Sequence, residues 1–366
     1  MARYLFAFIF LIHGCIHLAG YAKAFGYGNI TQLSKEISRP AGLAWLLAAI
    51  LLILAALLYL FNKGSWWMLA VPAIILSQVL IIFYWKDAKF GSIINIILLI
   101  AAIVGYADWN FNRMVKKEVS GLLALQQQSS TVVPQHKIEV LPPIIQKWLK
   151  HSGITGQNNI HTLRLKQKGV MITKPAGKWL DFTATQYFNA DNPAFNWQTK
   201  VSLMPLIYMT GRDKLENGEG EMLIKILSLK NVVETKHTME ITQGTMLRYL
   251  AEICWFPSAA MQDYISWEEI DPLAARATMT YNNIKVSGTF FFNADGDMTA
   301  FEAMRYGEFD GRSSLEKWHI DSKDYKTFSG IRVPSRFEIT WKLKDGDFTW
   351  LKIELTDLEF NISKMY

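Results

Sequence analysis

Four apolar stretches in the N-terminal third constrain this chain more than any other feature. They cover residues 4–22, 41–61, 65–85 and 91–109. Each is close to the ~20 residues that a helix needs to cross a bilayer. Aromatic residues such as Trp66 and Trp109 flank the stretches, as is typical of membrane–water interfaces. No small-residue cleavage site follows the first stretch, so we expect a retained domain of four transmembrane helices over residues 1–112.

The net positive charge of the chain belongs to this apolar part. The whole chain carries a net charge of +6, and residues 1–120 contain ten Lys/Arg against four Asp/Glu, so the remainder is formally neutral. Basic residues beside apolar helices fit anionic lipid head groups. A neutral remainder gives no electrostatic basis for binding nucleic acid. The sequence therefore predicts membrane lipids as partners and argues against nucleic acid. Basic residues are equally divided between the two sides of the helices, which leaves the orientation open.

The rest of the chain has the pattern of a soluble β-rich domain. A polar stretch at 113–134 predicts a short helical extension followed by a linker. Residues 141–151 form an amphipathic helix pattern, and a second helix is expected near 242–254. From residue 160 the dominant period is two, with glycine-containing hairpin turns. We expect an α+β domain over 135–366, dominated by a large, curved antiparallel sheet that is partly barrel-like.

One candidate site for chemistry lies on the second helix. Arg248 and Glu252 are four residues apart, so they share one helix face and can pair. If that face lies under the sheet, Glu252 could act as a general acid or base held by Arg248. If it is exposed, the pair is an ordinary surface ion pair. No nucleophile elbow, phosphate-binding loop or zinc-protease motif accompanies it, and no cofactor is predicted.

The aromatic content of the soluble half suggests a second kind of site. Alternation along the strands would send many large rings to one face of the sheet. They either fill a large core or line an apolar cavity in which a few polar side chains orient a ligand. The residues expected to line such a cavity are Trp179, Gln186, Trp197, Arg248, Trp255, Arg305, Trp318 and Trp341.

The third candidate lies within the apolar helices. His13 and His17 share one helix face, and ionisable groups at membrane depth suggest function. A zinc-like ion could use both but needs a third ligand, and the available residues are poor candidates. The alternative is hydrogen bonding between helices, with Gly14 and Gly20 allowing close approach. The two cysteines, Cys15 and Cys254, have neither the spacing of a metal site nor the placement of a disulfide.

Particular residues of the soluble half carry a resemblance to a known family. They are Leu141-Pro142-Pro143, Trp179, Gln186, Pro193, Phe195, Trp197, Arg248 to Glu252, Trp255, Pro257, Arg305, Trp318, Tyr325, Gly330, Pro334 and Trp341. With these residues, 135–362 resembles a bacterial domain family of unknown function. The membrane half resembles the small four-helix DoxX-like group. These resemblances imply no established activity, but they imply a multi-pass protein of the bacterial inner membrane whose soluble domain lies outside the cytoplasm.

These observations lead to one expectation and two alternatives. We expect a non-enzymatic envelope protein whose β domain binds a lipid or another apolar molecule. The first alternative is a hydrolase-like enzyme using Glu252 and Arg248. The second is metal or proton handling at His13 and His17.

Overall fold

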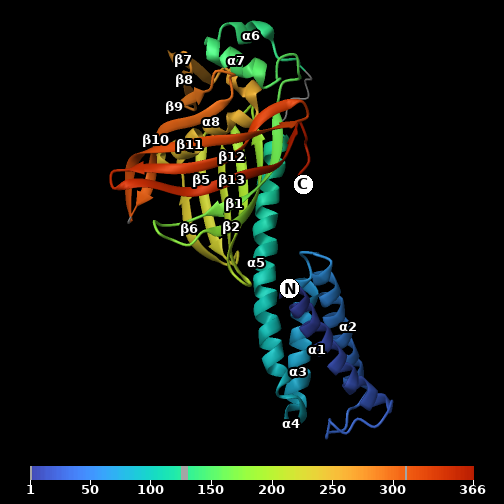
Figure 1. The fold of residues 1–366 in the computed structure, drawn as a ribbon. Helices are drawn as coiled ribbons and strands as arrows, with labels where there is room; N and C mark the ends of the chain where they lie inside the picture. Colours follow the sequence, from blue (N-terminus) through green and yellow to red (C-terminus); the bar gives the residue numbers. More distant parts are fainter. Residues whose placement is uncertain (1, 125–130, 310) are drawn as a thin grey trace. The chain divides into compact units, whose positions relative to one another are not determined.

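The computed structural model describes residues 2–124, 131–309 and 311–366. The chain divides into two compact units. A helical unit comprises Met1–Arg113 with Leu227–Leu229, and a β unit comprises Met114–Ile226 with Lys230–Tyr366. Figure 1 shows the helices of the first unit in blue and the sheet of the second in green to red.

The helical unit is built from the apolar stretches. Its helices are α1 (Ala2–Phe25), α2 (Arg39–Leu60), α3 (Trp67–Phe83), the short α4 (Trp85–Ala88) and α5 (Gly91–Ala124). By length and composition α1, α2 and α5 can cross a membrane, whereas α3 is a shorter apolar helix of 17 residues that contains Pro72. The backbone N–H of Ala41 donates to the Ser38 hydroxyl, which caps α2 at its N-terminus.

Small residues let α1 and α2 approach closely. A Cβ placed on Gly20 would lie only 2.2 Å from the indole of Trp45, and one on Gly14 would lie 3.2 Å from the carbonyl oxygen of Ala49. Ala48 and Ala49 on α2 are fully buried. Close backbone approach at small residues is the usual way in which apolar helices associate in a membrane.

A single antiparallel sheet of 13 strands forms the β unit. Its strands are β1 (Thr162–Met171), β2 (Leu180–Asn189), β3 (Ala194–Met204), β4 (Ile207–Glu216), β5 (Glu219–Ile226), β6 (Lys230–Lys236), β7 (Ile265–Asp271), β8 (Ala274–Tyr281), β9 (Ile284–Phe292), β10 (Met298–Phe309), β11 (Arg312–Phe328), β12 (Ile331–Leu343) and β13 (Gly346–Phe360). Sequence neighbours pair throughout each half, and β1 pairs with β13 to join the halves. The large antiparallel sheet predicted from the period-two pattern is thus confirmed, but among the described residues it does not close into a barrel. The polar sequence of β6 did not predict a strand.

Helix α8 (Met239–Glu252) connects the two edge strands of this sheet, β6 and β7. The short turns η1 (Ile253–Trp255) and η2 (Pro257–Met261) complete the connection. Figure 1 shows the sheet curving around α8, which packs on β4 and β5 from one half and on β9 and β10 from the other. Gly220 makes this possible, because a Cβ there would lie 2.1 Å from the Thr245 hydroxyl of α8.

The last turns of α5 belong to the β unit. The expected helical extension continues to Ala124, and the polar stretch 125–130 lies outside the described residues. The Glu118 carboxylate accepts a hydrogen bond from Asn196 Nδ2 at 2.8 Å and lies 3.4 Å from Arg212 Nε. The Leu122 carbonyl accepts one from Asn189 Nδ2 at 3.0 Å. Helices α6 (Gln135–Glu139) and α7 (Pro143–His151) follow.

Candidate ligand-binding cavity

The inner face of the curved sheet lines a cavity of about 750 Å³. Its wall consists mainly of large apolar and aromatic side chains from both halves of the sheet. They include Met171, Trp197, Val201, Met209, Met222, Ile224, Trp318, Phe337, Ile339, Trp341, Phe348, Trp350 and Ile353. Strand alternation explains this selection. On β4, for example, Met209, Gly211 and Asp213 face the cavity, whereas the intervening Arg212 points to the other face and lies near Glu118 of α5.

One face of α8 forms the remaining wall. Ile241, Gly244, Arg248 and Glu252 line the cavity at intervals of three and four residues, as one face of a helix requires. The opposite face carries Leu250 and other apolar side chains that are buried in the core of the unit. The helix therefore places Arg248 and Glu252 in the cavity and Leu250 with its apolar neighbours in the core.

A bonded network of charged side chains extends from α8 to β4. Arg248 Nε donates to Glu252 Oε1 at 2.9 Å, and Arg248 Nη1 donates to Asp213 Oδ2 at 3.0 Å. Gln186 Nε2 donates to the second Glu252 oxygen at 2.8 Å. The Arg248 guanidinium carbon also lies 4.7 Å from the centre of the Trp197 ring, within cation–π range. The pairing of Arg248 with Glu252 expected from their spacing is present, and it is buried.

Burial controls the proton affinities in this network. It raises the pKa of the Glu252 carboxyl above its usual range, against the opposing effect of Arg248. It likewise raises the pKa of Asp213. Cys254 also lines the cavity, and burial raises the pKa of its thiol well above the usual value. A protonated thiol is a poor nucleophile, so this cysteine is not activated for covalent chemistry.

Arg305 on β10 is the second arginine of the cavity. Its guanidinium carbon lies 4.6 Å from the centre of the Trp318 ring and 5.7 Å from that of Trp341. Arg305 Nε donates to the carbonyl oxygen of Gly244 at 3.2 Å. Burial, together with the neighbouring positive charge of Arg248, lowers the pKa of Arg305 to about 10. Arg305 therefore remains protonated at neutral pH.

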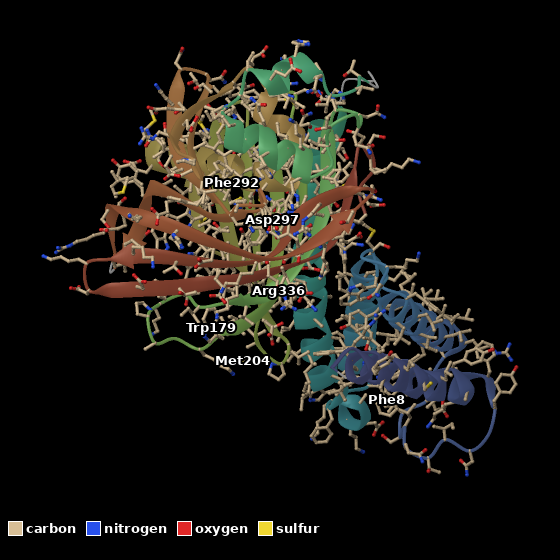
Figure 2. The ribbon with its side chains drawn as sticks, turned by 45° about the horizontal axis from the view of Figure 1, so that its top comes forward. Phe8, Trp179, Met204, Phe292, Asp297 and Arg336 are labelled. Carbon is tan, nitrogen blue, oxygen red and sulfur yellow. The ribbon has the colours of Figure 1, made fainter. Side chains whose placement is uncertain are left out.

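The structure brings together most of the residues predicted to bind a ligand. Those that line the cavity are Trp197, Arg248, Trp255, Arg305, Trp318 and Trp341, joined by Glu252. Gln186 is fully buried behind Glu252 and reaches the site through it. Trp179 does not line the cavity. It is 38% exposed, next to Lys352, and Figure 2 shows it at one end of the sheet.

Asp213 was not predicted as a site residue, although its sequence context contains a signal. It follows Met209 and Gly211 at intervals of two on one face of β4. A single carboxylate in a row of otherwise uncharged residues that face inward needs a partner, and here the partner is Arg248. The two residues are 35 positions apart in the sequence, so no local sequence pattern predicts that they pair.

His13 and His17 lie in the helical unit and bond differently. His13 Nε2 lies 2.9 Å from Asn95 Oδ1 and 3.2 Å from Ser77 Oγ, so it links α1 to α3 and α5. His17 Nδ1 lies 2.8 Å from the His13 carbonyl oxygen. Within the described ranges, no His, Cys, Asp or Glu joins the pair as a third metal ligand. This arrangement favours hydrogen bonding between helices over metal binding.

Two solved structures are distantly similar to this chain. A LolA superfamily protein from Nitrosomonas europaea is 10% identical, with 60% of this chain and 94% of that chain covered and a TM-score of 0.33. A beta-barrel-like protein of domain of unknown function DUF1849 from Brucella abortus is 13% identical, with 56% and 99% covered and a TM-score of 0.21. Scores this low support no inference about function. No curated protein matches the chain.

A family comparison is more informative. The model of DUF6544, a family of unknown function, matches residues 131–353. This range contains the whole cavity wall and agrees with the expected resemblance of 135–362 to a family of unknown function. The match does not include the apolar helices of residues 1–113, so the DoxX-like resemblance stays a prediction. The chain belongs to the DUF6544 family.

Proposed function

We propose that this protein is a membrane-anchored binding protein whose β unit holds a lipid or another apolar molecule in the cavity. The observation that carries the proposal is the cavity itself, about 750 Å³ with a mainly apolar and aromatic wall. Ligand pockets typically measure ~300–1,000 Å³ and combine such walls with a few polar groups. An apolar ligand in the cavity would remove much of this apolar wall from contact with water, which is favourable.

The rest of the chain supports a location at a membrane. Three helices are long and apolar enough to cross one, and the excess positive charge lies in the same part of the sequence. In this proposal the helical unit is an anchor and the β unit works beside the bilayer, at the envelope of a bacterial cell. The number of spans and an extracytoplasmic position for the β unit are parts of the proposal.

One observation favours a second candidate, a hydrolase-like enzyme. Glu252 lines the cavity, and burial raises its pKa toward the range of a general acid. However, both carboxylate oxygens already accept hydrogen bonds, one from Arg248 and one from Gln186. No activated nucleophile accompanies them among the lining residues that the structure describes. A structural role for this carboxylate is the better account.

A photoreactive long-chain alcohol tests the binding proposal. The full chain is placed in phosphatidylcholine nanodiscs with octadecanol that carries a diazirine in mid-chain, and labelled peptides are mapped after irradiation. We expect labelling of cavity peptides in the β unit, together with labelling of the apolar helices by probe in the bilayer.

A matched pair of variants makes this test specific. Met222→Trp adds an indole on the cavity side of β5 and should lower labelling of cavity peptides severalfold. Lys225→Trp adds the same group beside Thr210, on the other face, and should leave it unchanged. Absence of labelling in the β unit, or equal labelling in both variants, would refute the proposal.

A further inference from the structure

Arg305 has hydrogen-bonding capacity that the described residues do not use. A guanidinium has five N–H donors, and among these residues Arg305 uses only Nε–H, toward Gly244. In the part of the chain that the structure describes, neither Nη atom has a hydrogen-bond or ion-pair partner. The other arginine of the cavity differs, because Arg248 contacts two carboxylates, Asp213 and Glu252.

The fold holds this guanidinium in place without neutralising it. The rings of Trp318 and Trp341 lie against it, and the Gly244 carbonyl fixes Nε. Gly244 leaves little spare room, since a Cβ there would lie 3.3 Å from Arg305 Nε. The Nε1–H of Trp318 is another buried donor with no partner among the described residues. The site therefore offers several donors that the acceptors among the described residues do not use.

The nearby acidic groups that the structure describes do not provide the missing partner. Asp213 and Glu252 are bonded to Arg248, and both act on Arg305 only through space. Glu240 and Glu308 also line the cavity, but both are exposed and neither contacts Arg305. An unpaired cation in an apolar site is costly unless something pairs with it. A ligand with negatively charged oxygens would do so.

We propose that the cavity selects an amphiphile with an anionic head group, whose oxygens accept hydrogen bonds from the Arg305 Nη atoms while its apolar chain contacts the aromatic wall. This inference rests on the proposed function and adds the chemical class of the ligand. A planar guanidinium suits carboxylate and phosphate oxygens equally, through paired hydrogen bonds. The two sources of this chemistry are a free long-chain acid and a phospholipid head group.

The test compares probes that differ only in the head group. Diazirine stearate is used beside the matched diazirine octadecanol, with the full chain in phosphatidylcholine nanodiscs at mildly alkaline pH. Labelling of the apolar helices serves as the internal measure of probe concentration in the bilayer. Diazirine lysophosphatidate, as a third probe, separates a phosphate head group from a carboxylate.

We expect an anionic probe to half-saturate the cavity peptides at a concentration about tenfold or more below that of the alcohol, as expected for charge-assisted hydrogen bonds. Arg305→Met should remove this preference, so that the anionic probe and the alcohol half-saturate the cavity peptides of that variant at similar concentrations. Arg336→Met is the control, because Arg336 lies on the same sheet (Figure 2) but outside this cavity, where it pairs with Asp324. It should keep the preference.

Each outcome bears on the inference. Equal labelling of the wild-type cavity by acids and alcohol overturns an anionic ligand and leaves an apolar one standing. If Arg305→Met still prefers the anionic probe, the role of Arg305 is overturned. The same holds if that variant loses labelling by both probes. Arg305→Lys, which retains the charge, should keep part of the preference. If neither probe labels the wild-type cavity, the proposed function fails as well.

Discussion

Replacing Arg248 by methionine should destabilise the β unit strongly. The substitution removes the cation bonded to both Asp213 and Glu252 and keeps an apolar stem of similar length. The side chains of Arg248, Asp213 and Glu252 are only 14%, 17% and 11% exposed. Breaking a buried ion pair by removing one partner costs ~3–5 kcal/mol, because a buried charge is left uncompensated. Residual exposure favours the lower end, about 3 kcal/mol.

Thermal unfolding can be followed at a single site in the β unit. Cys254 is buried and Cys15 is the other cysteine, so a Cys15→Ser background leaves Cys254 as the reporter for a thiol-reactive dye. For a unit of this size each kcal/mol shifts Tm by about 2–4 °C, which predicts a decrease of roughly 6–12 °C. The decrease should be smaller at acidic pH, where protonation relieves the uncompensated carboxylates.

The control is an exposed ion pair on the same sheet. Arg276 Nη1 lies 3.2 Å from Glu268 Oε2, with side chains 48% and 66% exposed. Arg276→Met should cost less than about 1 kcal/mol and lower Tm by only a few degrees. If Arg248→Met shifts Tm no more than this control does, Arg248 does not neutralise a buried network and our reasoning is wrong.

Three other predictions concern charge and the helices. The pKa of Glu252 is raised in the folded state, so at a pH between its unfolded and folded pKa values unfolding releases a proton, and stability falls as pH rises through that window. Glu252→Gln should flatten this decline in the Cys254 assay. An unchanged pH profile in the variant would exclude the raised pKa. Glu118→Ala should lower the free energy of unfolding by about 1–3 kcal/mol in the same assay, because Arg212 (3% exposed) loses one of its carboxylate partners. An unchanged free energy of unfolding would show that this contact does not hold the end of α5 on the sheet. Replacing His13 and His17 together by Leu should leave the metal content unchanged by mass spectrometry, and a stoichiometric metal lost on replacement would restore the metal hypothesis.

Local sequence patterns predict the elements of this fold well. Period-two alternation locates all strands except β6, whose sequence is polar. Helix α8 follows from its spacing and from the Trp255-Phe256-Pro257 stop, although it begins at Met239 rather than near residue 242. Alternation also indicates that Trp197 and Trp341 lie on inward faces. These features depend on residues that lie within a few positions of one another in the chain, so they can be predicted from the sequence.

What the sequence does not display is curvature and long-range pairing. Whether a row of aromatic side chains fills a core or lines a cavity depends on how far the sheet bends around α8, and no local pattern encodes that. Asp213 meets Arg248 only because β4 and α8 face each other in space. Trp179 precedes β2 and lies outside the cavity, although its residue type suits the wall. The charged network and the free donors of Arg305 therefore emerge only in three dimensions.

The most direct test of the central claim is to identify what the cavity holds in the cell. The full chain and its Met222→Trp variant are purified in parallel, and the molecules that remain bound are extracted and identified by mass spectrometry. We expect an apolar molecule with an anionic head group at about one per chain in the wild type and at a strongly reduced level in the variant. Identical lipid profiles in both preparations, with no such molecule enriched, would contradict it.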